Sequence, residues 1–283
     1  MISIIICSLN ETLCKQCTEN IAATIGVEHE ILAIDNRIKS APICEVYNEA
    51  AKRARYDILC FLHEDILFHT ADWGKAIASV LSDETIGIVG ICGGTYKAKV
   101  TSAWIDIPHS YRRANMKSKD KGGNLIDYVV KSDATKNLSD TVTIDGLCLM
   151  MRKNVWQEFN FDEKNIRGFH YYDLDISIRV LEKYRLVVCH DIFIEHLSAG
   201  NFGTAWIDET FIFHERFRER LPLSVAVINV TEKNDLETFA MKRFLEKCND
   251  AKRLNLQLIA KLIWSYPAVA IKNLTFAIRI KNN

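Results

Sequence analysis

A short apolar run that ends in three consecutive polar side chains constrains this chain more than any other stretch. Residues 56–68 read YDILCFLHEDILF, and the apolar part from Ile58 to Leu62 is typical of a strand buried on both faces. His63, Glu64 and Asp65 follow directly. Open α/β sheets bind ligands at the carboxyl ends of their strands. The segment therefore predicts a metal and diphosphate site at one edge of such a sheet.

Strand and helix patterns alternate through the first hundred residues, which predicts right-handed βαβ units and a largely parallel sheet. The expected strands lie near residues 2–7, 30–34, 58–62 and 86–91, and the expected helices near 11–23, 43–55 and 73–81. Ser8 or Asn10 could cap the first helix. The second strand ends in a further polar cluster that begins at Asp35.

The pattern changes after this region. Residues 97–137 are polar and rich in Lys, which predicts an irregular segment, either a solvated loop or a loop that favours a phosphorylated or acidic substrate. Regular patterns return near Thr141. A helix is expected at 173–184 and a strand at 186–194, followed by His196.

The last sixty residues differ from the rest, and we expect a main domain at 1–223 and a helical extension at 224–283. Amphipathic helices are predicted near 236–248 and 254–264. No acidic residue follows Asp250, whereas six Lys and Arg residues do. Two interpretations stay open: helices attracted to anionic lipid, or helices that pack on the main domain or on a second subunit as a homo-oligomer.

Composition limits the class of partner and the compartment. With 36 basic and 36 acidic residues the formal net charge is +0, so we expect no nucleic-acid partner. Nine scattered cysteines suit a reducing cytoplasm better than a disulfide scaffold. The start of the chain lacks a signal-peptide pattern, and no apolar stretch is long enough to span a bilayer. We expect a cytoplasmic protein, with peripheral contact at the inner membrane face as the alternative.

Three polar residues at strand ends could form a metal site. Transfer of a sugar from a nucleotide donor needs a cation for the diphosphate, a carboxylate for the acceptor proton and a pocket for the nucleotide. Carboxylates suit Mg²⁺ or Mn²⁺, and Mn²⁺ also accepts imidazole. Asp65 with His63 or Glu64 could supply part of this site, and His196 could complete it. Each residue alone has an ordinary structural interpretation, so their joint placement carries the hypothesis.

Asp173 and Asp175 lie where a helix is expected to begin. An acid in this position can cap the helix, and the helix dipole then lowers its pKa. A general base near neutral pH needs a higher pKa. The sequence leaves both interpretations of Asp173 open.

Six segments occur in an order that is familiar from one enzyme family. They are ISIIICSLNE, EILAIDNR, VYNEAAKRARYDILCFLHED, TIDGLCLMMRKNVW, HYYDLDISIR and IEHLSAG. Over residues 1–220 this series resembles the GT-A glycosyltransferases of the family-2 type, and it is most similar to a bacterial branch that includes a streptomycin-biosynthesis protein. The resemblance implies an α/β GT-A (Rossmann-like) fold, a mostly parallel central sheet flanked by helices, with a C-terminal helical extension.

The resemblance also implies a role for individual residues. Asp173 would be the catalytic base, and Asp65 and His196 would hold a divalent cation, Mn²⁺ or Mg²⁺. The implied donor and nucleotide contacts are Ser8, Asn10, Asp35, Asn48, His63, Glu64, Asp145 and Gly146.

The chain departs from the family pattern at two positions. His63 stands where the first acid of the DxD motif is expected, and Tyr172 stands where Glu is common in the motif that carries the base. Asp65 and Asp173, the second members of these motifs, are retained. The departures bear on the metal site more than on the fold.

The resemblance implies inverting transfer of a sugar from a nucleoside-diphosphate sugar to a glycan or lipid-linked acceptor, in bacterial polysaccharide synthesis. Two alternatives stay open. A GT-A domain that binds sugar nucleotides without turnover is compatible with His63 in the metal motif. A nucleotidyltransferase usually carries a Gly-rich loop after the first strand, and the segment SLNETLCKQC contains no glycine.

Overall fold

The computed structural model describes residues 1–119, 123–198, 200 and 202–282. The chain divides into two compact units, the first made of Met1–Gly93 and Arg113–Ala199, the second of Gly94–Arg112 and Gly200–Asn283. These units have other bounds than the expected domains 1–223 and 224–283, and that domain assignment stays a prediction. Ala199 of the predicted IEHLSAG segment lies outside the described residues.

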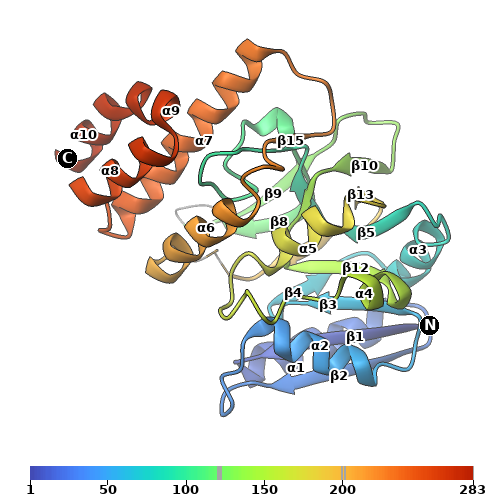
Figure 1. The fold of residues 1–283 in the computed structure, drawn as a ribbon. Helices are drawn as coiled ribbons and strands as arrows, with labels where there is room; N and C mark the ends of the chain where they lie inside the picture. The colour runs from blue at the N-terminus through green and yellow to red at the C-terminus, as the bar shows by residue number, and fades with distance from the viewer. Residues whose placement is uncertain (120–122, 199, 201, 283) are drawn as a thin grey trace. The chain divides into compact units, whose positions relative to one another are not determined.

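The first unit is built on a seven-stranded sheet with the strand order β10-β13-β5-β12-β3-β1-β2 (Figure 1). The strands are β1 (Ile2–Ser8), β2 (His29–Asp35), β3 (Ile58–Leu62), β5 (Ile86–Gly90), β10 (Leu138–Thr141), β12 (Cys148–Arg152) and β13 (Arg185–Cys189). Strand β1 is parallel to β2 and β3, and β5 is parallel to β13. Strand β12 is antiparallel to β3 and β5, and β10 is antiparallel to β13. All strands except β10 and β12 therefore run in one direction, which confirms the mostly parallel sheet.

Helices flank this sheet: α1 (Glu11–Thr24), α2 (Ile43–Arg53), α3 (Trp73–Val80), α4 (Lys153–Phe159) and α5 (Tyr172–Val180). Helix α1 begins where the sequence predicts, because the Asn10 side chain accepts hydrogen bonds from the backbone N–H groups of Thr12 and Leu13. Tyr47 on α2 and Phe61 on β3 pack with ring centroids 5.1 Å apart in the core. This packing holds α2 against the strand that leads to the polar cluster.

A second, six-stranded sheet has the order β11-β6-β8-β14-β4, with β9 paired to β8. Its strands are β4 (Ile66–Phe68), β6 (Cys92–Gly94), β8 (Arg112–Lys119), β9 (Leu125–Val130), β11 (Thr143–Ile144) and β14 (Ile194–His196). The prediction of an irregular segment at 97–137 is wrong for β8 and β9, which form an antiparallel pair. Strand β8 carries Arg112, Arg113, Lys117 and Lys119, and these charges hid the strand pattern. Leu125, Ile126 and Val129 of β9 are exposed apolar residues. The strand expected at 186–194 is divided between β13 and β14.

The second unit is mainly helical, as expected for the C-terminal extension. It contains α6 (Thr204–Arg216), α7 (Val230–Asp250), α8 (Leu256–Ser265), α9 (Pro267–Lys272) and α10 (Leu274–Asn282), with the 3₁₀ helix η1 (His109–Tyr111) and the strand pair β7 (Tyr96–Lys97) and β15 (Leu223–Ser224). Within the described part of the chain, no helix is both long enough and apolar enough to cross a bilayer.

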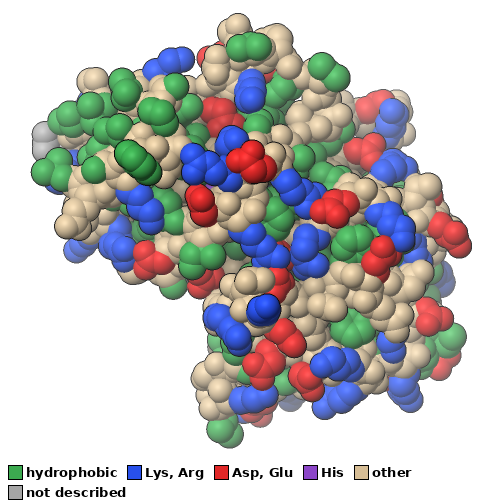
Figure 2. All heavy atoms as spheres, in the orientation of Figure 1, with side chains coloured by type: hydrophobic (Ala, Val, Ile, Leu, Met, Phe, Trp, Pro, Cys, Tyr) green, Lys and Arg blue, Asp and Glu red, His purple; other side chains and the backbone are tan. Residues whose placement is uncertain are grey.

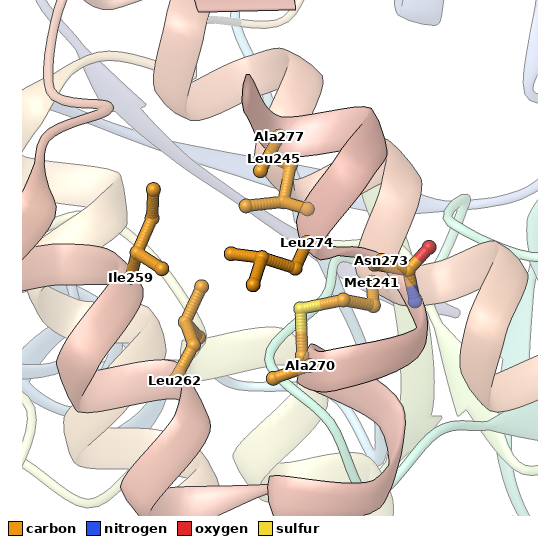
Figure 3. A pocket seen from close by; sticks show the side chains of 8 residues that line it. All are labelled: Met241, Leu245, Ile259, Leu262, Ala270, Asn273, Leu274 and Ala277. Carbon is orange, nitrogen blue, oxygen red and sulfur yellow. The ribbon is translucent and has the colours of Figure 1, made fainter. Parts of the chain in front are cut away.

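Helices α7 to α10 enclose a small pocket (Figure 3). It is lined by Met241, Leu245, Ile259, Leu262, Ala270, Asn273, Leu274 and Ala277. Seven of these eight side chains are apolar, and they face one another from four helices. The pocket is therefore part of the packing between these helices, and it holds no group suited to acid–base or metal chemistry.

Buried charges in the second unit have polar partners within that unit. The Glu237 carboxylate accepts hydrogen bonds from the Tyr96 hydroxyl at 2.6 Å and from the backbone N–H of Val100 at 2.9 Å. Lys247 and Asp106 form a buried ion pair. Lys97, one of the basic residues of the predicted loop, is fully buried, and its Nζ lies 2.7 Å from Ser102 Oγ. It is therefore not available to a substrate.

Candidate active site

Two separate segments of the first unit deliver a group of possible metal ligands. The chain leaves β3 at Leu62 and continues through His63 to Asp65, and β4 then pairs antiparallel with β14. In this pair His196 lies opposite Ile66, next to Asp65. The ligand atoms of His63, Asp65 and His196 all lie within 4.8 Å of one another. The sheet pairing thus brings together two predicted metal ligands and a third residue, His63, which was predicted to contact the donor.

The protonation of Asp65 and His63 suits metal binding. Burial would lower the pKa of His196, but the hydrogen bond and charge of Asp65 raise it, so a proton leaves His196 when a cation binds. Burial by itself would raise the pKa of Asp65, but the hydrogen bond and charge of His196 hold it well below its usual range. The carboxylate oxygen Oδ2 lies 3.3 Å from His196 Nε2. Burial lowers the pKa of His63, which keeps this imidazole neutral, the form that binds metals. One carboxylate and two imidazoles form a mixed oxygen and nitrogen set that suits Mn²⁺ better than Mg²⁺.

Glu64 has a different place from its two neighbours. Its carboxylate accepts a hydrogen bond from the Ser8 hydroxyl at 2.6 Å, and it accepts further bonds from the backbone N–H groups of Leu9 and Asn10 at 2.9–3.1 Å. The Ser8 hydroxyl is therefore already bonded within the protein. The Asn10 side chain is also bonded, because it caps helix α1. These hydrogen bonds of Glu64 hold the loop after β1 in place.

The predicted base lies on the first turn of α5. Tyr171, with a φ of 65°, is the N-cap residue, so Asp173 is not the cap. Asp173 Oδ2 accepts a hydrogen bond from the Gly146 N–H at 3.0 Å. Burial, followed by the negative charge of Asp145, raises the pKa of Asp173 to about 7. A carboxyl with this pKa can exchange a proton near neutral pH. Asp173 is an acid of the first turn and not the cap, and burial outweighs the lowering effect of its backbone hydrogen bonds on the pKa.

Tyr172 connects the metal ligands to the segment that carries Asp145. Its hydroxyl donates a hydrogen bond to the Gly146 carbonyl at 3.0 Å and lies 2.9 Å from His63 Nε2. A Cβ atom at Gly146 would lie 2.2 Å from this hydroxyl, so the position requires glycine. The contact between Tyr172 and His63 was not predicted from the sequence. The only sign of it there is that both residues depart from the family pattern.

Asp35 and Asn48, both predicted to contact the donor, lie in different environments. Asp35 ends β2 opposite Ser8 of β1, so it reaches the same sheet edge as the loop after β1. It forms an exposed ion pair with Arg37 at 2.6 Å, and hydrogen bonds from Arg37 lower the pKa of Asp35 to about 2. This carboxylate is accessible to a ligand.

Asn48 is buried on α2. Its amide nitrogen donates to the carbonyl of Phe161 and to the Glu163 carboxylate, and its amide oxygen accepts from Trp156 Nε1 and from the Phe161 N–H. These four bonds use the full capacity of the amide. Asn48 therefore holds α2 to the segment after α4, and it has no atom left for a donor molecule.

The sheet order, the dominant strand direction and the polar strand ends define a GT-A fold. The chain belongs to the glycosyltransferase-like family, whose model matches residues 3–213. No curated protein sequence matches the chain.

Solved structures of glycosyltransferases share this fold. The structure of S. aureus TarS 1–349 in complex with UDP-GlcNAc is 13% identical, with a TM-score of 0.53, and the match covers 99% of this chain and 88% of that one. A structure of GalNAc-T7 with UDP, GalNAc and Mn²⁺ is 9% identical, with a TM-score of 0.51. That match covers 87% of this chain but only 56% of the GalNAc-T7 chain. At these identities the similarity establishes the fold alone.

Proposed function

We propose that this protein is a metal-dependent glycosyltransferase that moves a sugar from a nucleoside-diphosphate sugar to an acceptor hydroxyl with inversion at the anomeric carbon. One observation carries the proposal. Three residues that could hold a metal ion are linked to a carboxyl group whose pKa is raised to about 7, through hydrogen bonds of Tyr172 with His63 and Gly146 and of Gly146 with Asp173. This combination provides both a site for a diphosphate-bound cation and a base for the acceptor.

The proposed reaction assigns one role to each group. Asp65, His196 and His63 would hold Mn²⁺ or Mg²⁺, which when bound offsets the charge that develops on the diphosphate leaving group. Asp173 would take the proton from the acceptor hydroxyl as its oxygen attacks the anomeric carbon. Because attack comes from the face opposite the diphosphate, the configuration inverts. The Gly146 N–H orients the Asp173 carboxylate for this step.

The nucleoside would lie at the ends of β1 and β2. Ser8 and Asp35 are opposite one another in the parallel pair, and the Asp35 carboxylate is half exposed. Glu64 keeps the Ser8–Asn10 loop in place through its hydrogen bonds. We propose that Asp35 and this loop contact the nucleoside and that Asp145 contacts the sugar.

A panel of sugar nucleotides tests the proposal. UDP-, GDP- and dTDP-sugars and the corresponding nucleoside triphosphates, each with and without Mn²⁺, are added to the whole protein while thermal unfolding is followed. A ligand at a hundred times its dissociation constant should add ~3 kcal/mol to the free energy of unfolding. The donor that stabilises the protein is then incubated with it, and release of the nucleoside diphosphate is measured.

Three outcomes separate the hypotheses. Stabilisation that requires Mn²⁺, together with release of the diphosphate, supports the glycosyltransferase. Stabilisation without any release in the presence of glycan and lipid-linked acceptors favours the binding domain without turnover, and stabilisation by a nucleoside triphosphate favours the nucleotidyltransferase. Asp65→Asn should abolish the stabilisation that the sugar nucleotide gives in the presence of Mn²⁺. Asp208→Asn, which breaks an exposed ion pair between α6 and Arg253, should leave this stabilisation unchanged.

We further propose a cytoplasmic enzyme of bacterial glycan or glycoconjugate synthesis whose helices α8–α10 contact anionic lipid. Leu256 is 76% exposed, Trp264 87%, Ile271 59% and Ile278 51%. Figure 2 shows hydrophobic side chains gathered over the helices that Figure 1 labels α8 to α10. Since no acidic residue follows Asp250, a second copy of this surface would bring like charges together, whereas anionic lipid complements them.

Vesicle sedimentation tests this surface. Wild-type protein should sediment with vesicles that contain phosphatidylglycerol more than with neutral vesicles, and salt should weaken the binding. Trp264→Ser should reduce sedimentation, whereas Val227→Ser, at an exposed position before α7, should not. Equal sedimentation of both variants with the wild type, or a dimer in solution that Trp264→Ser dissociates, would contradict lipid binding.

A further inference from the structure

A hydrogen bond joins the two positions at which the chain departs from the family pattern. His63 replaces the first acid of the metal motif, and Tyr172 replaces the common Glu beside the base. The Tyr172 hydroxyl lies 2.9 Å from His63 Nε2, although the residues are 109 positions apart in the sequence. Tyr172 is only 3% exposed, so water does not compete freely for this bond.

The partners of Tyr172 determine the direction of the bond. A phenol hydroxyl has one hydrogen to donate, and its oxygen can accept. The Tyr47 hydroxyl is a third partner, and it donates its own hydrogen to the Leu62 carbonyl at 3.4 Å. The Gly146 carbonyl, 3.0 Å from the Tyr172 oxygen, can only accept and is a stronger acceptor than a phenol oxygen, so it receives the Tyr172 hydrogen. Donation to His63 instead would take that hydrogen from the buried Gly146 carbonyl, which is unfavourable. The Tyr172 oxygen therefore accepts from His63, and Nε2 carries the imidazole hydrogen.

The second ring nitrogen of His63 is then the one with a free lone pair. In a neutral imidazole one nitrogen is the donor and the other the acceptor, so a hydrogen on Nε2 leaves Nδ1 for a cation. The rings of Phe169 and His196 lie beside the imidazole, with centroids at 5.6 Å and 6.3 Å. Hydrogen bonds of this kind, made to the far nitrogen of a metal-binding histidine, fix both tautomer and orientation.

We propose that Tyr172 is a positioning residue that holds His63 in the Nε2–H tautomer and thereby presents Nδ1 to the cation. The inference rests on the metal site of the proposed function. The inference explains the two departures from the family pattern together. His63 takes the place of an acid as the metal ligand, and Tyr172 fixes the tautomer that His63 needs for this role. The resulting site should select a cation that accepts imidazole, so Mn²⁺ should bind more tightly than Mg²⁺.

Two measurements on the full chain test the proposal. In metal-free protein labelled with ¹⁵N-histidine, long-range ¹⁵N–¹H correlations should show the Nε2–H tautomer of His63 in the wild type and a mixture in Tyr172→Phe. Calorimetric titration with Mn²⁺ should show affinity reduced about 10- to 100-fold in Tyr172→Phe. Tyr56→Phe, which removes an exposed hydroxyl bonded to Glu28, is the matched control and should match the wild type in both measurements.

A double-mutant cycle separates positioning from general damage. In the His63→Ala background Tyr172→Phe should cause no further loss of Mn²⁺ affinity. An equal loss in both backgrounds, or an Nδ1–H tautomer of His63 in the wild type, would overturn the inference. Wild-type protein that binds no Mn²⁺ would contradict the metal-dependent function instead, because the tautomer is measured without metal.

Discussion

Both units of the molecule contain ionisable groups that are removed from water, and Asp173 differs from the others in the charge of its neighbour. In the second unit Lys97 donates to Ser102 and to His214 Nε2 at 2.8 Å, and Lys247 is paired with Asp106. In the first unit the pKa of Asp173 is raised by burial and by a neighbour of the same sign. Buried charges with complementary partners hold a structure together, whereas a partly buried carboxyl beside a like charge is poised to exchange a proton.

The largest effect is expected from Asp173→Asn. The variant keeps an acceptor for the Gly146 N–H but removes the base, so kcat should fall about 10²- to 10⁴-fold. Sugar-nucleotide turnover measures this loss, and donor binding should be retained. Unchanged turnover would contradict the assignment of Asp173 as the base.

The same variant should be more stable than the wild type at pH 8. Since the pKa of Asp173 is about 7 in the folded protein and 3.8 is its usual value, unfolding releases a proton between these pH values. Stability therefore falls as pH rises through this window, and removing the carboxyl should recover on the order of 4 kcal/mol at pH 8. Asp175→Asn, which breaks a partly buried ion pair with Arg179, is the neighbouring control and should destabilise the protein.

Asp106→Asn should have the next largest effect, on stability. It leaves the buried ammonium of Lys247 without its carboxylate, so the free energy of unfolding should fall by roughly 3–5 kcal/mol. Asp208→Asn breaks an exposed pair with Arg253 and should cost about 0–1 kcal/mol. Urea denaturation compares the two variants, and equal losses would show that the buried pair is no more important than the exposed one.

Glu64→Gln should have a smaller effect, on donor binding. A Gln amide places an NH₂ group among the backbone N–H donors of Leu9 and Asn10, so the loop after β1 should loosen. We expect the donor Kd to rise ~10-fold while Mn²⁺ affinity is unchanged, both measured by calorimetry. Glu28→Gln, at an exposed position, is the control. A loss of Mn²⁺ affinity in Glu64→Gln would make Glu64 part of the metal site.

The strands and the grouping of Asp65 with His196 could be predicted from the sequence, because apolar runs that stop at polar residues place both at one sheet edge. The pair of strands β8 and β9 could not, because the Arg and Lys side chains of β8 resemble those of a solvated loop. The anchoring role of Glu64 depends on backbone N–H groups from a distant segment. The hydrogen bonds by which Asn48 holds α2 to the segment after α4 depend on packing between residues far apart in the chain. Local patterns carry no information on such contacts.

The smallest expected effect is that of Lys97→Met on the pH dependence of turnover. This variant tests whether the group that titrates lies in the first unit or in the second. The pKa of Lys97, lowered by burial, is also about 7, the same value as that of Asp173. A base must be deprotonated, so kcat/KM should rise with pH, reach half its maximum near pH 7 and fall about tenfold per unit in more acid solution. Lys97→Met should leave this midpoint unchanged, because Lys97 is enclosed by its own partners. A midpoint that moves in Lys97→Met would place the titrating group in the second unit and remove the distinction between structural and reactive buried charge.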